Sequence, residues 1–363
     1  MVKKKVLFIY NGGTIGMVSE ARGNQTILVP PKDGKTFEKV CNDILKDFIE
    51  NLDVSFEVMT TKDSTNMTPK DWEKLIFRIV KAQEKEGYDA VGIAHGTDTL
   101  AYTATALALA LHGRKPKKSG LKIPVCLTGA QTTLYERGGD GKFNLENLFR
   151  TLQVSVDTGI ADVLINFWDR VLLGCRALKS SEKDFDAFMS PAYPEVGHID
   201  GLGVHLNTDL LKKAIDAEKG FDVAPKFGRG VIAFELAPGI EPNVVLGFIA
   251  NGGLSAIILK SLGEGNVCNE GEYNLLPTIE RATKEFFVPV FITTKFVGGR
   301  AASSIYEVGY EAVKAGGIPC YDQTDVAVDV KVRWLIGNGI CSSITDFRKA
   351  METSYAGEVT PQE

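Results

Sequence analysis

Histidine and cysteine are scarce in this sequence, which has only four histidines and six cysteines in 363 residues. The cysteines are scattered singly and no Cys-x-x-Cys pair occurs, so neither a disulfide framework nor a cysteine-based zinc site is expected. We predict reduced, mostly buried thiols. With so few thiol and imidazole ligands, we expect no metal site at the centre of the chemistry.

Long apolar runs and a strong net charge are missing as well. No stretch approaches the ~18 uninterrupted apolar residues of a transmembrane helix, so no membrane partner is expected. The run Val6–Tyr10 is too short for the apolar core of a signal peptide and is followed at once by Asn-Gly-Gly. A formal net charge of −5 argues against a nucleic-acid partner.

Short apolar runs alternate with helical patterns in the first half of the chain. Thr68 and Pro69 are typical of a helix start, Gly87 of its end, and Leu100–His112 reads as a deeply packed Ala-rich helix. Strands that alternate with helices predict crossover connections and a parallel sheet. The predicted strands are Val6–Tyr10, Ser55–Thr60, Ala90–Ala94 and Ile123–Leu127, with a hairpin from Val163–Phe167 and Val171–Leu178.

The length predicts two domains, at about 150 residues per domain. A second series of strands begins at Val231, after a segment rich in Gly, Pro and charge. We therefore predict an α/β protein with two α/β domains. The larger N-terminal catalytic domain, 1–195, has a mostly parallel sheet with helices on both faces plus a β-hairpin. A linker, 196–228, leads to a smaller C-terminal parallel-sheet domain, 229–363.

Three polar motifs follow predicted strands, where open α/β sheets place their ligands. The first, 11–16, reads Asn-Gly-Gly-Thr-Ile-Gly and puts Thr14 at the rim of the sheet, next to glycine amides that can donate to an oxyanion. A dinucleotide loop is a competing interpretation, but the G-x-G-x-x-G spacing is absent. A tight turn with a capping threonine is the structural alternative.

The other two motifs carry hydroxyls beside carboxylates. The second, 63–68, reads Asp-Ser-Thr-Asn-Met-Thr and fits either a small polar substrate or turn and capping chemistry. The third, 95–100, places Thr97 beside Asp98 at the start of the Ala-rich helix, where anions are favoured. Such a pair needs a base, and a lysine made neutral by burial can serve. His95 competes for that role, although a histidine between a strand and a glycine is typical of a hydrogen-bonded structural residue.

In their order and spacing these motifs resemble the bacterial-type L-asparaginase family, most closely its cytoplasmic type I branch. The resemblance continues through 127–131, 140–144, 176–179, 185–191 and 263–266, and so covers essentially the full chain. It implies a cytoplasmic amidohydrolase of asparagine catabolism. Such an enzyme converts L-asparagine to L-aspartate and ammonia without metal or cofactor.

The resemblance also assigns roles to single residues. The nucleophile falls on Thr14, and a hydroxyl–amine–carboxylate relay falls on Thr97, Lys179 and Asp98. The relay would activate the water that hydrolyses a threonine acyl-enzyme. The implied substrate-binding residues are Gly13, Asp63, Ser64, Thr65, Gly96 and Ala130.

One part of the family pattern is missing. Many members carry a lid tyrosine shortly after the first motif, and Leu28 stands in its place here. The segment Ser19–Gly34 is polar and glycine-bearing, as expected of a lid. Tyr306 is the candidate to assist Thr14 instead, and a helix tyrosine packed in the core is the alternative.

The sequence leaves several functional alternatives open. Asparagine and glutamine differ by one methylene, worth about 1–3 kcal/mol in a pocket, so a glutaminase/asparaginase of broad specificity remains possible. A relative of the amidotransferase D subunit and a non-catalytic amino-acid-binding protein are further alternatives. The family resemblance also implies a homodimer or a homotetramer.

Overall fold

The structure is a computed structural model. It describes residues 3–31, 34–46, 51–115, 119–214, 223–301 and 307–361. The chain divides into two compact units. The first takes in Met1–His112, Lys118–Ser190 and Pro194–Val223, and the second Gly113–Lys117, Pro191–Tyr193 and Ala224–Glu363. Among the described helices, none has the length and apolar character needed to span a bilayer.

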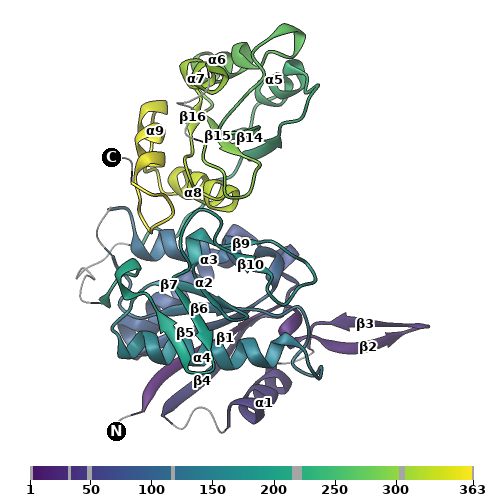
Figure 1. Ribbon diagram of the computed structural model, residues 1–363, viewed down its shortest axis with the longest axis vertical. Coiled ribbons are helices and arrows are strands. Elements are labelled where there is room, and N and C mark those ends of the chain that lie inside the picture. The colour runs from purple at the N-terminus through teal and green to yellow at the C-terminus, as the bar shows by residue number, and fades with distance from the viewer. Residues whose placement is uncertain are drawn as a thin grey trace. The chain divides into compact units, whose positions relative to one another are not determined.

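An eight-stranded mixed sheet forms the centre of the first unit (Figure 1), with the strand order β12-β11-β8-β7-β6-β5-β1-β4. Strands β4, β1, β5, β6 and β7 run parallel, and β8, β11 and β12 continue the sheet in antiparallel pairs. The predicted α/β class and the mostly parallel sheet are confirmed. The strands are β1 Lys4–Asn11, β4 Leu52–Thr60, β5 Ala90–His95, β6 Val125–Thr128, β7 Val163–Phe167, β8 Arg170–Leu173, β11 Gly197–Asp200 and β12 Gly203–Leu206.

Four helices cover this sheet, and they contact one another in two pairs, α1 with α4 and α2 with α3. All but one residue of the Ala-rich α3 are buried, as its composition predicts. Thr68 and Asp71 form a capping box at the start of α2, and Gly87, in the left-handed conformation, ends the turn that follows that helix. The helices are α1 Gly34–Leu45, α2 Pro69–Lys81, α3 Leu100–His112 and α4 Asp140–Asp157.

One prediction for an irregular segment needs correction. The 196–228 segment, predicted as a linker, contributes β11 and β12 to the edge of the sheet. These strands are only four residues long and half exposed, so they lack the apolar signal of the central strands. The segment predicted as a lid forms a hairpin of β2 Val18–Arg22 and β3 Gln25–Val29, which extends away from the rest of the first unit in Figure 1. Its role as a lid stays a prediction.

The second unit contains a four-stranded parallel sheet with the order β13-β14-β15-β16. Its buried apolar residues, among them Leu259, Ile279 and Ile292, come from strands and helices alike. The smaller parallel-sheet domain predicted for this half is therefore confirmed. Its elements are β13 Val231–Glu235, α5 Pro242–Ala250, β14 Ala256–Ser261, α6 Leu276–Lys284, β15 Val290–Thr294, α7 Glu307–Lys314, β16 Ile318–Pro319, α8 Asp325–Gly337 and α9 Ile344–Glu352.

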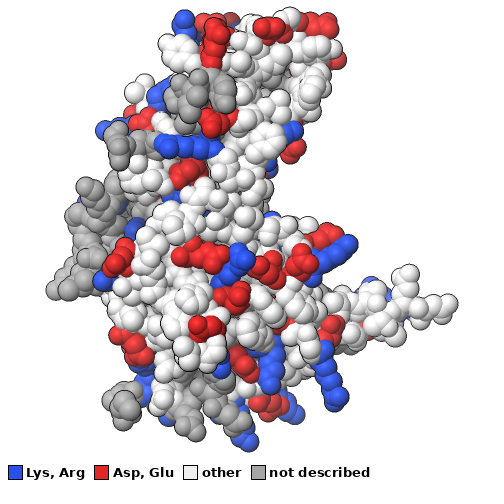
Figure 2. Space-filling view, viewed as in Figure 1, with Lys and Arg blue, Asp and Glu red and all other residues white. Residues whose placement is uncertain are grey.

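Acidic and basic side chains are interspersed over the face shown in Figure 2. Neighbouring charges of opposite sign weaken each other's field at a distance, and salt screens what remains over about 10 Å. Any ligand that this face attracts must therefore be recognised by local contacts.

A close backbone contact joins the loops at the carboxyl edge of the first sheet. Gly13 has a φ of 97°, and a Cβ built on it would lie 2.4 Å from the N and Cα atoms of Gly96. A Cβ on Gly96 would in turn lie 2.4 Å from the Oγ atom of Ser64. Only glycine permits these approaches. The loops after β1, β4 and β5 can pack this closely because Gly13 and Gly96 carry no side chain.

The Gly13→Ala substitution tests this contact, with Gly23→Ala as its control. Both positions have positive φ, but nothing lies within 4 Å of a Cβ on Gly23. We expect Gly23→Ala to lose about 1–2 kcal/mol of unfolding free energy from backbone strain alone. Gly13→Ala should lose about 1–3 kcal/mol more, because the new methyl group forces the loops apart. Urea unfolding measures both values, and equal losses would contradict the proposed close contact.

The second unit contains a fully buried ion pair that stabilises its C-terminal segment. The Nζ atom of Lys331 lies 2.8 Å from Glu358 Oε1, and both side chains are 0% exposed. Lys331 Nζ also donates to the carbonyl of Thr353 at 2.8 Å, while Glu358 accepts the N–H of Ala356 at 2.8 Å. Burial by itself would raise the pKa of Glu358, but the Lys331 ammonium and the hydrogen bonds lower it on balance.

Lys331→Met should cost about 3–5 kcal/mol of unfolding free energy, because it leaves a buried carboxylate without its partner. The double variant Lys331→Met/Glu358→Gln should recover most of that loss in urea unfolding. Because the folded pKa of Glu358 is lowered, wild type should exceed Glu358→Gln in stability above about pH 4.3, and the advantage should vanish as pH falls through the folded pKa. A single variant as stable as the double one would refute this role of the pair.

Candidate active site

The three polar motifs meet at one edge of the first sheet. They follow β1, β4 and β5, which are neighbours in the order β5-β1-β4, and all three strands end at the same edge because they are parallel. Gly13 and Gly96 are in contact, and Thr14 and Thr97 are the residues that directly follow them in the sequence. The structure thus brings together the backbones of the loops that carry these hydroxyl groups.

Lys179 connects the third motif to a segment far away in sequence. Its Nζ atom donates to Thr97 Oγ1 at 2.9 Å and to Asp98 Oδ1 at 2.6 Å. Lys179 lies in β9, Leu178–Lys179, which pairs with β10, Phe188–Met189. The Lys179 side chain is 20% exposed and that of Asp98 is 58% exposed, so the amine is shielded while the carboxylate faces solvent. The hydroxyl, amine and carboxylate are therefore in hydrogen-bond contact, as the predicted relay requires.

The second motif approaches Asp98 from the other side. Thr65 Oγ1 lies 3.5 Å from Asp98 Oδ2 and donates to it. Ser64 is buried, and its carbonyl accepts the hydroxyl of Thr99 at 2.9 Å, which fixes the second motif to the third. Asp63 caps the turn at residues 64–66 by accepting the N–H of Thr65 at 2.8 Å. The Asp63 carboxylate thus has a structural task in this loop.

Thr14 begins a short turn that is stabilised by hydrogen bonds from Met17 and Tyr10. This turn, Thr14–Gly16, is closed by the N–H of Met17, which donates to the Thr14 carbonyl at 3.0 Å. The hydroxyl of Tyr10, a buried residue of β1, donates to the carbonyl of Gly13 at 3.3 Å. Burial raises the pKa of Tyr10, so this phenol remains a donor at neutral pH. Thr14 itself is half-buried and accessible at the rim of the sheet.

A loop after β6 closes the site on a third side. A Cβ on Gly129 would lie 3.2 Å from Thr97 Cγ2, so this loop packs against the relay, and the following residue, Ala130, is buried. Asn144 Nδ2 donates to the Gly129 carbonyl at 3.0 Å and to Asp140 Oδ2 at 3.1 Å. The first turns of α4 thereby fix the position of Ala130.

Gln131 is a positioning residue to which the sequence assigned no role. Its backbone N–H donates to Asp140 Oδ2 at 2.9 Å. Its side-chain Nε2 donates to the carbonyls of Ser181, at 3.3 Å, and Asp184, at 3.2 Å. These two residues follow Lys179, so Gln131 ties the β6 loop to the segment that carries the amine. Its contacts are to backbone carbonyls distant in sequence, which no local pattern reveals.

His95 is a structural residue, as its flanking strand and glycine indicate. Its Nδ1 lies 2.8 Å from the Gly96 carbonyl and its Nε2 lies 2.9 Å from Thr103 Oγ1. Burial lowers the pKa of His95 to about 4, although the Gly96 carbonyl acts in the opposite direction. The ring is therefore neutral at pH 7 and both of its nitrogens are occupied, so Lys179 is the better candidate base.

Two further expectations concern Tyr306 and metal ligands. Tyr306 lies outside the described residues, so its role stays a prediction. Leu28, in β3, is 41% exposed. Within the part of the chain that the structure describes, the one group of three side chains with metal-ligand spacing comes from His198, Asp200 and His205 in β11 and β12. The loops around Thr97 hold hydroxyls, an amine and carboxylates instead.

The six cysteines are free thiols, and four of them are buried, as predicted. Burial raises the pKa of Cys126 and Cys320, which makes these thiols poor nucleophiles. The hydroxyls at the sheet edge are therefore the better candidates for nucleophilic chemistry.

Comparison with known proteins agrees with this geometry. The family model "Asparaginase, N-terminal" matches residues 5–212, and the model "Glutaminase/Asparaginase C-terminal domain" matches residues 230–351. The chain is 31% identical to L-asparaginase 1 of Escherichia coli over 366 aligned residues, which cover 100% of both chains.

Two archaeal relatives are similar over most of the chain. L-asparaginase of Thermococcus kodakarensis is 33% identical over 82% of this chain and 84% of its own. Its solved structure covers 99% of this chain and 100% of its own, with a TM-score of 0.82 and 28% identity. The D subunit of glutamyl-tRNA(Gln) amidotransferase from Pyrococcus abyssi is 31% identical over 82% of this chain and 65% of its own length. Since both family models match and together span nearly the whole sequence, the chain belongs to the L-asparaginase family.

Proposed function

We propose that this protein is an L-asparaginase, which hydrolyses L-asparagine to L-aspartate and ammonia through a threonine acyl-enzyme. The observation that carries the proposal is the amine of Lys179, hydrogen-bonded at once to Thr97 and Asp98 beside the loop of Thr14. Activation of a hydroxyl requires a base and a group that orients the base, and Thr97, Lys179 and Asp98 are a hydroxyl, an amine and a carboxylate in contact. The full-length similarity to E. coli L-asparaginase 1 supports the same substrate.

The first half of the reaction would be carried by Thr14. Its Oγ attacks the side-chain amide carbon of asparagine, and its proton passes by way of the base to the leaving nitrogen, so that ammonia departs and an aspartyl ester remains. An amide is a poor electrophile, so the negative charge that develops on its oxygen needs backbone donors. The N–H groups of Gly13 and Gly96 lie in the touching loops and are the proposed donors.

The relay of Thr97, Lys179 and Asp98 would carry the second half. A neutral Lys179 amine takes a proton from water through the Thr97 hydroxyl, the hydroxide adds to the ester carbon, and aspartate leaves as Thr14 regains its proton. In the free protein, Lys179 Nζ lies 2.6 Å from Asp98 Oδ1. A substrate α-ammonium group bound at Asp98 would compete for that carboxylate and repel the Lys179 charge.

Recognition of a small zwitterion would follow from the same groups. Ser64 and Thr65 offer hydroxyls and turn amides to an α-carboxylate, and Asp98 accepts the α-ammonium group. Thr65 and Asp98 lie 3.5 Å apart, oxygen to oxygen, close enough to bind the two charged groups on one α-carbon. The buried Ala130 carbonyl would complete the pocket. Asp63 would contribute through its cap of the turn.

Two further parts of the proposal concern the residues and chains around this pocket. Tyr306 is proposed to assist Thr14 in place of the missing lid tyrosine. A homodimer or homotetramer is proposed from the family resemblance. Neither is needed for the contacts of Lys179 described above.

Lys179→Met should lower kcat by about 10²–10⁴-fold, because it removes the proposed general base while keeping most of the side-chain volume. The matched control is Lys183→Met in the same segment, whose side chain is 84% exposed and pairs with Glu182 at 3.8 Å. The control should keep wild-type kcat in an assay of ammonia release. Full activity of Lys179→Met would remove the lysine from the mechanism.

Substrate preference distinguishes the open alternatives. We expect kcat/KM to be about 10–200-fold higher for asparagine than for glutamine, which corresponds to one methylene in a fitted pocket. Thr14→Ala should abolish ammonia release from both amides, while binding of L-aspartate, measured by calorimetry, should persist. Equal kcat/KM values would identify a glutaminase/asparaginase of broad specificity. A wild-type protein inert on both amides would leave the amidotransferase-like or non-catalytic alternatives.

A further inference from the structure

Two of the four histidines form a pair on the surface of the edge hairpin. His95 and His112 are buried, whereas His198 and His205 are exposed. His198 in β11 lies directly opposite His205 in β12, and their rings stack with centroids 4.8 Å apart and planes 20° apart. Among the described residues, the two exposed histidines of this histidine-poor chain therefore lie side by side.

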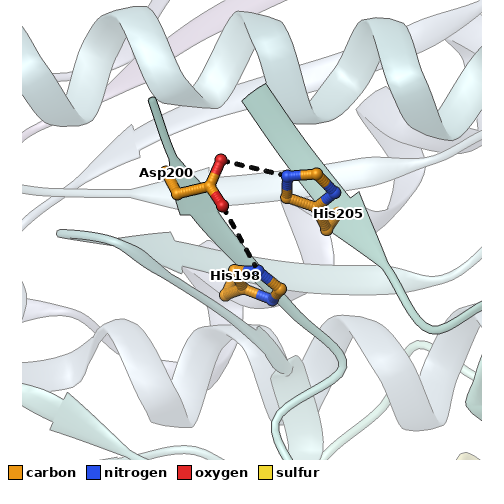
Figure 3. A group of neighbouring side chains, drawn as sticks. All are labelled: His198, Asp200 and His205. Atoms are coloured by element: carbon orange, nitrogen blue, oxygen red, sulfur yellow. Dashed lines mark hydrogen bonds and ion pairs between the residues drawn. The ribbon is translucent and has the colours of Figure 1, made fainter. Parts of the chain in front are cut away.

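Asp200 adds a carboxylate to the same face of this hairpin. Side chains two residues apart on a strand point to the same side, so Asp200 follows His198 on that side (Figure 3). Asp200 Oδ1 lies 3.0 Å from His205 Nε2, and Asp200 Oδ2 lies 3.8 Å from His198 Nε2. One ligand atom from each residue lies within 4.8 Å of the other two.

Two imidazoles and one carboxylate are a donor set that suits zinc and neighbouring first-row metals. Ligand atoms around a tetrahedral zinc ion lie roughly 3.3 Å apart, given bond lengths of about 2.0–2.1 Å. Small side-chain rotations would bring the three groups to that spacing, since strand pairing already holds their backbones. The N–H of Leu202 donates to Asp200 Oδ1 at 2.8 Å, which orients the carboxylate in the way that outer hydrogen bonds orient metal ligands.

The space next to the histidines leaves a coordination position open. His198 and His205 line a surface depression of about 300 Å³ together with Glu195 and Asn207. Glu195 is engaged there, because its Oε1 accepts a hydrogen bond from Arg170 Nη1 at 2.8 Å. A water molecule is therefore the natural fourth ligand.

We propose that His198, Asp200 and His205 bind one divalent transition-metal ion of the zinc type, with water in the fourth position. The site is independent of the proposed asparaginase activity, because β8, β7 and β6 separate β11 from β5, which leads to Thr97. A bound ion would link β11 and β12, two strands of four residues each, at the edge of the sheet. A metal that binds only the folded hairpin stabilises it by mass action.

The test is a titration of tag-free, chelator-treated protein with Zn²⁺ and with Co²⁺, whose absorption reports on tetrahedral nitrogen and oxygen ligands. We expect one equivalent to bind, and His198→Ala and His205→Ala each to weaken binding at least tenfold. Cys268→Ser, which removes an exposed thiol, is the matched control and should bind as wild type does. Stoichiometric binding that survives both histidine changes, or that Cys268→Ser abolishes, would overturn the proposal.

A second measurement does not depend on the folding of the variants. In wild-type protein, saturating Zn²⁺ should slow amide hydrogen exchange at residues 197–206, and Mg²⁺ should leave it unchanged, because the harder ion prefers oxygen ligands. The rate of ammonia release from asparagine should be the same with and without Zn²⁺. Exchange in this hairpin that Zn²⁺ does not alter would also overturn the proposal.

Discussion

The contact between Gly13 and Gly96 is the constraint on which the candidate site depends. Two polar loops end neighbouring parallel strands, and their backbones touch because neither residue carries a side chain. Ser64 fills the remaining space beside Gly96, which adds the loop of a third strand. Thr14 and Thr97 follow these glycines directly in sequence, so the packing that closes the sheet edge also fixes the loops that carry both threonines. The same short loops therefore close the edge of the sheet and carry the proposed catalytic threonines.

The charged groups of the site follow from this arrangement. Lys179 reaches Thr97 and Asp98 from a two-stranded element outside the main sheet, and Gln131 bonds the segment that follows Lys179 to the loop after β6. A lysine partly shielded by these loops can exchange a proton with a hydroxyl without any histidine. The buried, neutral His95 serves the packing of β5 and α3 instead. The scarcity of histidine in the sequence is therefore compatible with base catalysis.

The sequence predicted the central strands well because β1, β5 and β6 are fully buried over most of their length and read as continuous apolar runs. It also placed three polar motifs after predicted strands, where open α/β sheets bind their ligands, and these motifs lie together because parallel strands end at one edge. It predicted the hairpin of β7 and β8 but missed that of β11 and β12, which are short, half exposed and polar and lie in the segment predicted as a linker. Gln131 and the pair of His198 with His205 depend on contacts across strands or loops, which periodicity along the chain cannot show.

We propose that Thr14 is the nucleophile and that a bound amino acid lies beside it. The most direct test is peptide mapping after reaction with a diazoketone analogue of L-asparagine, whose diazo carbon replaces the amide nitrogen and alkylates a neighbouring activated hydroxyl with loss of N2. We expect a single label on Thr14, formed more slowly when L-aspartate is present. A label on Thr97 instead, or labelling that L-aspartate does not slow, would contradict the role of Thr14.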